Sequence, residues 1–395
     1  MTPTGFNPEE ATRAYIDSLG PEALARAAAY TTGNHWLLLG GLIASGLVTW
    51  LIVKMGWLNA IERRFGERSN IGVFLIGLVY SLVSAVILLP WTIYSNWWRE
   101  LQYDRTSQAL GDFLSQWAIS SVIGAIILPV FFVLLYLFIR RARQTWWIWG
   151  GGLTAAFVSL LMVLSPIYIE PLFNAFEPLP EGEVRDAIEV LAAEVEIPAD
   201  RIFVYDGSRQ SNNFTANVAG VGPSARIAIS DVALGDASLD EVLAVTGHEI
   251  GHYVSGHVWN LVFAFSALAL IFFFIASRAF PVFAGVFGAH PDIARAAGLP
   301  VLLFMVSVFG TLAEPVTNAL VRHGEVEADE YSLETVGLPD GLASALVKTA
   351  EYRNPRPSAL EEILFYTHPS VERRVLRAME WKAEHMDETD SATTN

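Results

Sequence analysis

Hydrophobic residues along the chain are gathered into long runs that are separated by polar blocks. A helix needs about 20 apolar residues to cross the hydrocarbon core of a bilayer. Six runs reach that length, at 36–54, 71–95, 117–140, 146–168, 258–279 and 298–321. Tryptophans stand at the edges of several runs, where their rings favour the headgroup level. The pattern therefore predicts six transmembrane helices, and the apolar stretch 281–287, too short to span, is predicted to be re-entrant or interfacial.

The polar blocks between these runs predict how the chain is divided. We expect an N-terminal tail (1–35), four spans (36–168) and a folded domain that carries a histidine-rich helix (169–257). Two further spans (258–321), a mostly helical block (322–381) and an acidic disordered tail (382–395) follow. Helical periodicity over 184–192, and β-branched residues at 201–205 and 225–229, predict one helix and two short strands. The predicted fold class is mainly α: a multi-pass helical membrane protein with an α+β domain. The polar first 35 residues predict no cleavable signal peptide.

Composition narrows the possible partners and ligands. Hydrophobic residues make up 53% of the 395 residues and charged residues only 17%, as expected for a chain embedded in a lipid bilayer. The net charge of −16 argues against nucleic acid as a partner. The chain has no cysteine, which excludes disulfides, cysteine nucleophiles and thiolate metal sites. Histidine and carboxylate side chains are the metal ligands that remain.

One short motif predicts a reaction: His248-Glu249-Ile250-Gly251-His252. On an α-helix, residues four apart share a face, so His248 and His252 can close on one tetrahedral metal ion. Zinc suits two imidazoles with an open position for water, and Glu249 lies one residue round from the first ligand. The motif predicts metal-assisted hydrolysis of an amide, with a histidine-rich helix end that binds nothing as the alternative. His257 follows at the wrong spacing for the same face and is interpreted as a polar flanking residue.

A catalytic zinc site needs a third protein ligand. Glu325 and Asp329 are four apart and share a helical face, so one carboxylate can bind the metal while the other holds a ligand imidazole. Glu325 is the preferred ligand, and Glu327, on another face of that helix, is the rival. A solvated acidic helix is the alternative for this segment.

Several motifs in order resemble the M48 zinc metallopeptidases, and among these the Ste24-type CAAX prenyl proteases. They are the histidine motif, Glu325-Val-Glu-Ala-Asp329, Thr367-His-Pro-Ser-Val-Glu-Arg-Arg374, Pro178-Leu-Pro-Glu-Gly182 and Leu89-Pro-Trp-Thr-Ile-Tyr94. The resemblance implies a zincin-like peptidase domain above a ring of helices, with one Zn²⁺ on His248, His252 and Glu325. It also implies that Asp329 supports a ligand and that His368 and Arg374 face the substrate; the alternative for His368 is a helix cap.

The resemblance further implies a strand that holds the main chain of the substrate. Members of the family usually carry Asn-Ala there, and this chain has Thr215-Ala216-Asn217, so the role of the amide is in doubt. Asn213 or Asn217 is a candidate to replace it. Such a strand would bind a peptide by adding it to a sheet edge.

The hypothesis is a membrane zinc metalloendopeptidase in which Glu249 takes a proton from the zinc-bound water and passes it to the leaving amine. Its partners are a peptide or protein substrate, with or without a lipid modification, and the bilayer. An inactive scaffold of the same fold, a quality-control protease without prenyl specificity, and a transporter are the alternatives. The resemblance implies an inner-membrane protein with a cytoplasmic metal domain. The arginines of the short loops, Arg63, Arg64 and Arg68 and then Arg140, Arg141 and Arg143, favour the reverse orientation.

Overall fold

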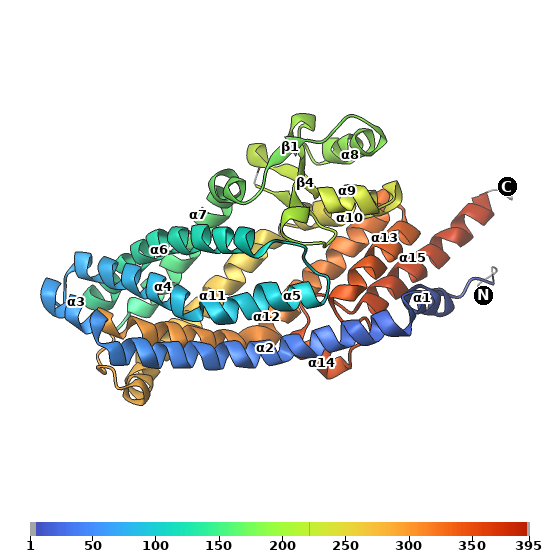
Figure 1. Cartoon of the computed structure of the whole chain (residues 1–395). Coiled ribbons are helices and arrows are strands. Elements are labelled where there is room, and N and C mark those ends of the chain that lie inside the picture. Colours follow the sequence, from blue (N-terminus) through green and yellow to red (C-terminus); the bar gives the residue numbers. More distant parts are fainter. Residues whose placement is uncertain (1–4, 221, 393–395) are drawn as a thin grey trace.

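Helices account for most of the computed structural model, which describes residues 5–220 and 222–392 (Figure 1). They are α1 (Pro8–Asp17), α2 (Gly20–Met55), α3 (Trp57–Phe65), α4 (Asn70–Ile93), α5 (Arg99–Gln102), α6 (Leu110–Arg141), α7 (Trp146–Leu164), α8 (Glu183–Glu194), α9 (Asp231–Asp236), α10 (Leu239–Val254), α11 (His257–Phe287), α12 (Leu299–Val336), α13 (Pro339–Lys348), α14 (Ala359–Phe365) and α15 (Val371–Ala392).

Six helices in the described ranges are long and apolar enough to cross a membrane, which confirms the predicted spans. They contain α2, α4, α6, α7, α11 and α12. Helices α4 and α7 continue through π-helical turns at Tyr94–Trp98 and Ser165–Ile169. The prediction for 281–287 was wrong, because α11 continues through Pro281 to Phe287 without a break. A proline in an apolar helix is tolerated where neighbouring helices compensate for the lost hydrogen bond.

Both predicted tails contain helix. Residues 8–17 form α1, and α2 already begins at Gly20, sixteen residues before the first apolar run. At the other end α15 continues to Ala392, where a disordered tail was predicted from residue 382. Residues 1–4 and 393–395 of these predicted tails lie outside the described residues. The described parts of both segments are therefore elements of the fold.

A small mixed sheet lies in the block between the fourth and fifth spans. Its strands are β1 (Phe176–Pro178), β2 (Ile202–Tyr205), β3 (Ala216–Ala219) and β4 (Arg226–Ser230), in the order β1-β2-β4-β3. The two strands predicted from β-branched residues are β2 and β4, which pair in parallel. Strand β3 pairs antiparallel with β4 and lies at the edge of the sheet.

Helix α10, which carries the histidine motif, lies between this sheet and α12 (Figure 1). Val242 and Ile250 of α10 are buried in one cluster with Ile227 and Ile229 of β4. Fully burying each such side chain contributes about 1.5–3 kcal/mol relative to exposure. This packing fixes the rotation of α10, so that His248 and His252 face α12.

Candidate metal centre and active site

The N-terminus of α10 is fixed by a capping box. The side chain of Ser238 accepts a hydrogen bond from the backbone amide of Glu241, whose carboxylate accepts one from the amide of Ser238 at 2.7 Å. The same carboxylate accepts a hydrogen bond from Ser344 at 2.6 Å and pairs with Lys348 at 2.7 Å. Reciprocal caps satisfy backbone donors that the helix leaves free. The cap therefore also joins α10 to α13.

Two glycines let α10 approach α12 closely. A Cβ atom on Gly251 would lie 3.0 Å from the Cα atom of Ala328, and one on Gly247 would lie 2.5 Å from a methyl group of Val336. Backbones can approach this closely only where side chains are absent. The glycine inside the histidine motif therefore brings His248 and His252 within reach of Glu325 on α12.

Three side chains converge at this contact. The Nε2 atoms of His248 and His252 are 3.1 Å apart, and each lies 3.4 Å from an oxygen of Glu325. One ligand atom from each residue lies within 4.8 Å of the others. Glu327, the rival candidate for third ligand, is not a member of this cluster.

Asp329, one turn beyond Glu325, determines the tautomer of His248. Its Oδ1 atom lies 2.9 Å from Nδ1 of His248, so Nδ1 carries the proton and Nε2 presents its lone pair to the cluster. Arg374 of α15 holds this carboxylate with two bonds, from Nε at 2.8 Å and from Nη2 at 2.6 Å. Burial alone would lower the pKa of His248, but the carboxylates of Asp329 and Glu325 raise it to about 9, so a cation that binds at Nε2 must displace a second proton from that atom.

His257 contacts Nδ1 of His252, as Asp329 contacts Nδ1 of His248, and Glu327 in turn contacts His257. Nε2 of His257 lies 2.7 Å from an oxygen of Glu327, and Nδ1 of His257 lies 2.8 Å from Nδ1 of His252. If His257 donates to the carboxylate, its Nδ1 accepts the proton of His252. His252 then also presents an unprotonated Nε2 to the cluster. His257 is therefore a neighbour of a candidate ligand, and not merely a polar flanking residue.

The donor atoms fit a bound cation. With both Nδ1 atoms protonated, two lone pairs and a carboxylate face one another with no proton between them. The Oε2 atom of Glu325 is buried and has no hydrogen-bond partner among the described residues. Such an arrangement of buried acceptors is costly unless a positive ion lies among them. Two imidazoles and one carboxylate suit zinc.

His368 and Arg374 lie beside this cluster. Nε2 of His368 is 3.2 Å from Glu325, and Nη1 of Arg374 is 3.6 Å from the other oxygen of the same carboxylate. Burial, followed by the charge of Arg353, lowers the pKa of His368 to about 3, so the imidazole is neutral. Burial also raises the pKa of Glu249.

A cavity of about 250 Å³ opens onto these groups, and Glu249, His248, His368 and Arg374 line it. Of the three predicted substrate-binding residues, Thr215 and Ala216 line the cavity, whereas Asn217 does not. Asn213, the other candidate to replace the family amide, does line it.

The sequence analysis missed Arg353 and the apolar wall formed by Leu342 and Leu346. The amphipathic segment after Pro339 was the available signal for that wall. For Arg353 the sequence offers no comparable signal.

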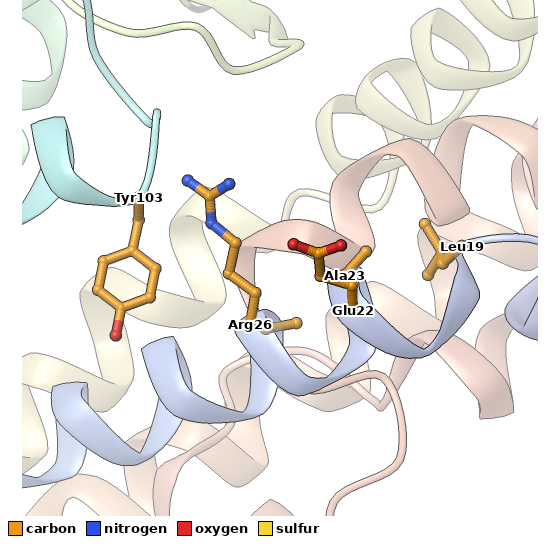
Figure 2. Close-up of a pocket in the computed structure, with 6 residues that line it drawn as sticks. Leu19, Glu22, Ala23, Arg26 and Tyr103 are labelled. Carbon is orange, nitrogen blue, oxygen red and sulfur yellow. The ribbon is translucent and has the colours of Figure 1, made fainter.

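A second cavity, of about 260 Å³, lies where α2 passes the end of α5. Figure 2 shows Arg26 and Glu22 of α2 projecting toward it, with Tyr103 on the opposite side. Arg26 pairs with Asp104 at 2.5 Å. Of the described residues that line this cavity, none belongs to the metal cluster or its neighbours.

Comparison with known proteins agrees with this geometry. The model of peptidase family M48 matches residues 178–382, and a model described as CAAX prenyl protease N-terminal, five membrane helices, matches residues 7–175. The described residues of that second region hold four of the six candidate spans. The two matches together account for nearly the whole chain.

Similar proteins are found in bacteria and eukaryotes. An uncharacterised metalloprotease of Bacillus subtilis is 28% identical over 93% of this chain and 88% of its own length. CAAX prenyl protease 1 of Saccharomyces cerevisiae is 31% identical over 78% of this chain and 72% of its own. The crystal structure of Ste24p from S. mikatae has a TM-score of 0.73 and 21% identity, covering 94% of this chain and 95% of that one, and so shares the fold.

The chain belongs to peptidase family M48, in its Ste24-type branch of membrane metalloproteases. The expected family and fold class are thereby confirmed.

Proposed function

We propose that this membrane protease is a zinc endopeptidase whose metal is held by His248, His252 and Glu325. The observation that carries the proposal is the convergence of three acceptor groups, two buried and one half-buried, next to a cavity lined by His248 and Glu249. Zinc, when bound, supplies a Lewis acid that makes water acidic near neutral pH and polarises a carbonyl group. Side chains of the protein carry out the proton transfers and stabilise the developing negative charge.

Glu249 is proposed as the general base. It lines the cavity and follows His248 directly, so its carboxylate can accept a proton from an attacking water and later give it to the leaving amine. His368 and Arg374 line the same cavity and offer N–H donors to the oxygen that becomes negative. Asp329 contributes indirectly, because it holds both His248 and Arg374.

The substrate is proposed to be an extended polypeptide that adds to the edge of the sheet. Ala216 of β3 lines the cavity that contains Glu249. Val218 and Ala219 of β3 line a different cavity, of about 360 Å³, which reaches His252 and is separate from the one beside α2. A chain lying along β3 would therefore pass the metal cluster from one cavity into the other. Pairing with an edge strand binds a peptide through hydrogen bonds to its main chain, which every sequence offers.

The Glu249→Gln variant tests the general base. It should keep its zinc, because Glu249 is not a ligand, and lose peptide cleavage by about 10²- to 10⁴-fold, the usual contribution of a general base. Zinc content by atomic absorption and peptide hydrolysis in detergent measure the two effects. Glu334→Gln, an exposed carboxylate on α12, is the matched control and should keep both. Full activity of the Glu249 variant would refute the assignment.

Lipid-modified substrates are proposed because relatives are named CAAX prenyl proteases. Cleavage products of prenylated and unprenylated forms of one peptide should be compared by mass spectrometry, with the Glu249→Gln protein as blank. Preference for the prenylated form is expected. Equal cleavage of both would favour a quality-control protease, and no cleavage by the zinc-loaded protein would favour an inactive scaffold.

We propose an inner-membrane location with the metal domain in the cytoplasm. Helix α10, which carries the histidine motif, and α3, which ends just before Gly66, lie toward opposite ends of the long apolar helices, so reporters at the two places must differ (Figure 1). A fluorescent reporter at the C-terminus should be active, and alkaline phosphatase fused after Gly66 should be active on the other side. The reverse result would establish the orientation that the loop arginines favour.

A further inference from the structure

A third cavity, of about 510 Å³, lies far from the metal centre, among the opposite ends of the membrane helices. It is bounded by the loop before α4, the end of α6 and the connection between α11 and α12. Because α12 rises about 1.5 Å per residue, the 26 residues from its start to Glu325 separate the two places by roughly 39 Å. Five arginines line the cavity: Arg68, Arg140, Arg141, Arg143 and Arg295.

Among the described residues, Arg295 is the one of these five arginines that forms an ion pair. Arg295 pairs with Glu62 at 2.8 Å and with Glu67 at 3.4 Å. Glu67 is one of the two carboxylates that line the cavity. Within the described ranges, no carboxylate lies within 4.0 Å of the other four guanidinium groups. Asp292, the second lining carboxylate, accepts a hydrogen bond from the amide of Ala294. In a chain with a net charge of −16, this is a local excess of positive charge.

Arg140 has two buried guanidinium nitrogens that the described residues do not satisfy. Its Nε donates to the carbonyl of Ala294 at 3.3 Å, and its guanidinium carbon lies 5.4 Å from the centre of the Tyr136 ring. Its Nη1 and Nη2 atoms are buried and have no hydrogen-bond partner among the described residues. An unpaired buried guanidinium is costly, and the fork of two N–H groups matches the oxygens of a phosphate.

The cavity lies at the level where lipid headgroups are expected. Trp57 and Trp149, which are 53% and 54% exposed, stand at the same ends of the spans. Tryptophan rings concentrate at the membrane interface. We propose that this cavity binds the phosphate of an anionic membrane phospholipid, held by Arg140 and by the arginines at its rim. Basic pockets between membrane helices are a known mode of headgroup recognition.

Native mass spectrometry of the delipidated full chain in detergent tests the proposal with two lipids. Phosphatidylglycerol, which is anionic, should bind more tightly than phosphatidylcholine, which is zwitterionic. The double variant Arg68→Gln/Arg140→Gln should lower phosphatidylglycerol affinity roughly 30-fold, since each arginine near a membrane surface contributes about fivefold. If that variant does not fold, Arg141→Gln/Arg143→Gln, which changes only exposed side chains, replaces it.

The matched control is Arg63→Gln/Arg64→Gln, which removes the same charge from exposed positions of α3 outside the cavity. It should change the affinity less than threefold, because distant exposed charges are screened. Equal losses in both double variants would overturn the proposal in favour of general surface attraction, and so would equal binding of the two lipids. Inorganic phosphate is the third probe. Binding of phosphate through the same arginines, without binding of lipid, would also overturn it and assign the cavity to a soluble anion.

Discussion

At the scale of single residues, each histidine of the metal cluster is contacted at Nδ1, the ring nitrogen that faces away from the cluster. Asp329 lies against Nδ1 of His248, and His257, itself paired with Glu327, lies against Nδ1 of His252. Each contact engages Nδ1 and leaves Nε2 facing Glu325. Neighbours of this kind fix the orientation and basicity of a ligand imidazole. The support of His252 is less direct, because a second imidazole stands between it and the carboxylate.

Replacing His257 by Phe tests that support. The ring volume is largely retained and both hydrogen bonds are lost, so His252 becomes free to rotate. Zinc affinity, measured by competition with a chromogenic chelator, should fall about 10- to 100-fold. Saturating zinc should restore much of the cleavage rate. His323→Phe is the control, because His323 also contacts Glu327, at 3.3 Å, but is 76% exposed and does not contact His252. Unchanged zinc affinity in the His257 variant would show that the contact is incidental.

The residues of the cluster could be predicted, and the support of His252 could not. His248 and His252 follow from helical spacing and the coordination that zinc requires, and the family resemblance favoured Glu325 over Glu327 as the third ligand. His257 was interpreted as a polar flanking or interface residue and not a ligand, and it is not a member of the cluster; its contact with His252 was not predicted because the spacing argument treated the helix as continuous. Helix α10 ends at Val254, Gly256 takes a left-handed conformation with φ of 64°, and α11 begins at His257. That bend turns His257 back toward His252, and spacing within one helix cannot describe it.

At the scale of elements, the site depends on the contact between α10 and α12. Gly251→Ala should destabilise the protein by about 1–3 kcal/mol, because the new methyl group would lie 3.0 Å from Ala328. In an open helix the same change would be stabilising. Thermal unfolding followed by tryptophan fluorescence, together with zinc content, measures the effect.

Gly235→Ala in α9 is the control for this contact, since a Cβ atom there has nothing within 4 Å. It should be neutral or slightly stabilising. If the two glycine variants unfold at the same temperature, close approach of α10 to α12 does not limit stability.

The membrane helices could be predicted because length and apolar composition are local properties of each run. The two tails were misread for the opposite reason, since their helices depend on distant partners. Ile16 of α1 is buried in a cluster with Val375 and Met379 of α15, and Lys382 pairs with Asp340 at 2.5 Å. Figure 1 shows α1 and α15 side by side near the two chain ends. Composition alone contains no information about such contacts.

At the scale of the whole molecule, the metal cluster joins two polar segments that are separated in the sequence by two membrane-spanning helices. After His252 the chain leaves through α11, crosses back through α12 and only then supplies Glu325. The hydrophobic pattern divides the peptidase domain into two blocks and does not predict that they meet. The need for a third ligand and the family resemblance were the features of the sequence that joined them, and the structure places Glu325 at the junction.

A metal at this junction should stabilise the whole molecule, because it links α10 to α12. Removing zinc with a chelator should therefore lower Tm by several degrees, since a ligand present at about 1,000 times its Kd contributes about 4 kcal/mol. Adding zinc should restore Tm, and magnesium should not, because it prefers oxygen ligands. The His252→Ala variant is the control and should respond little to either treatment. A wild-type Tm that is insensitive to chelator, with loss of metal verified, would mean that packing across the two glycines holds the halves together without the ion.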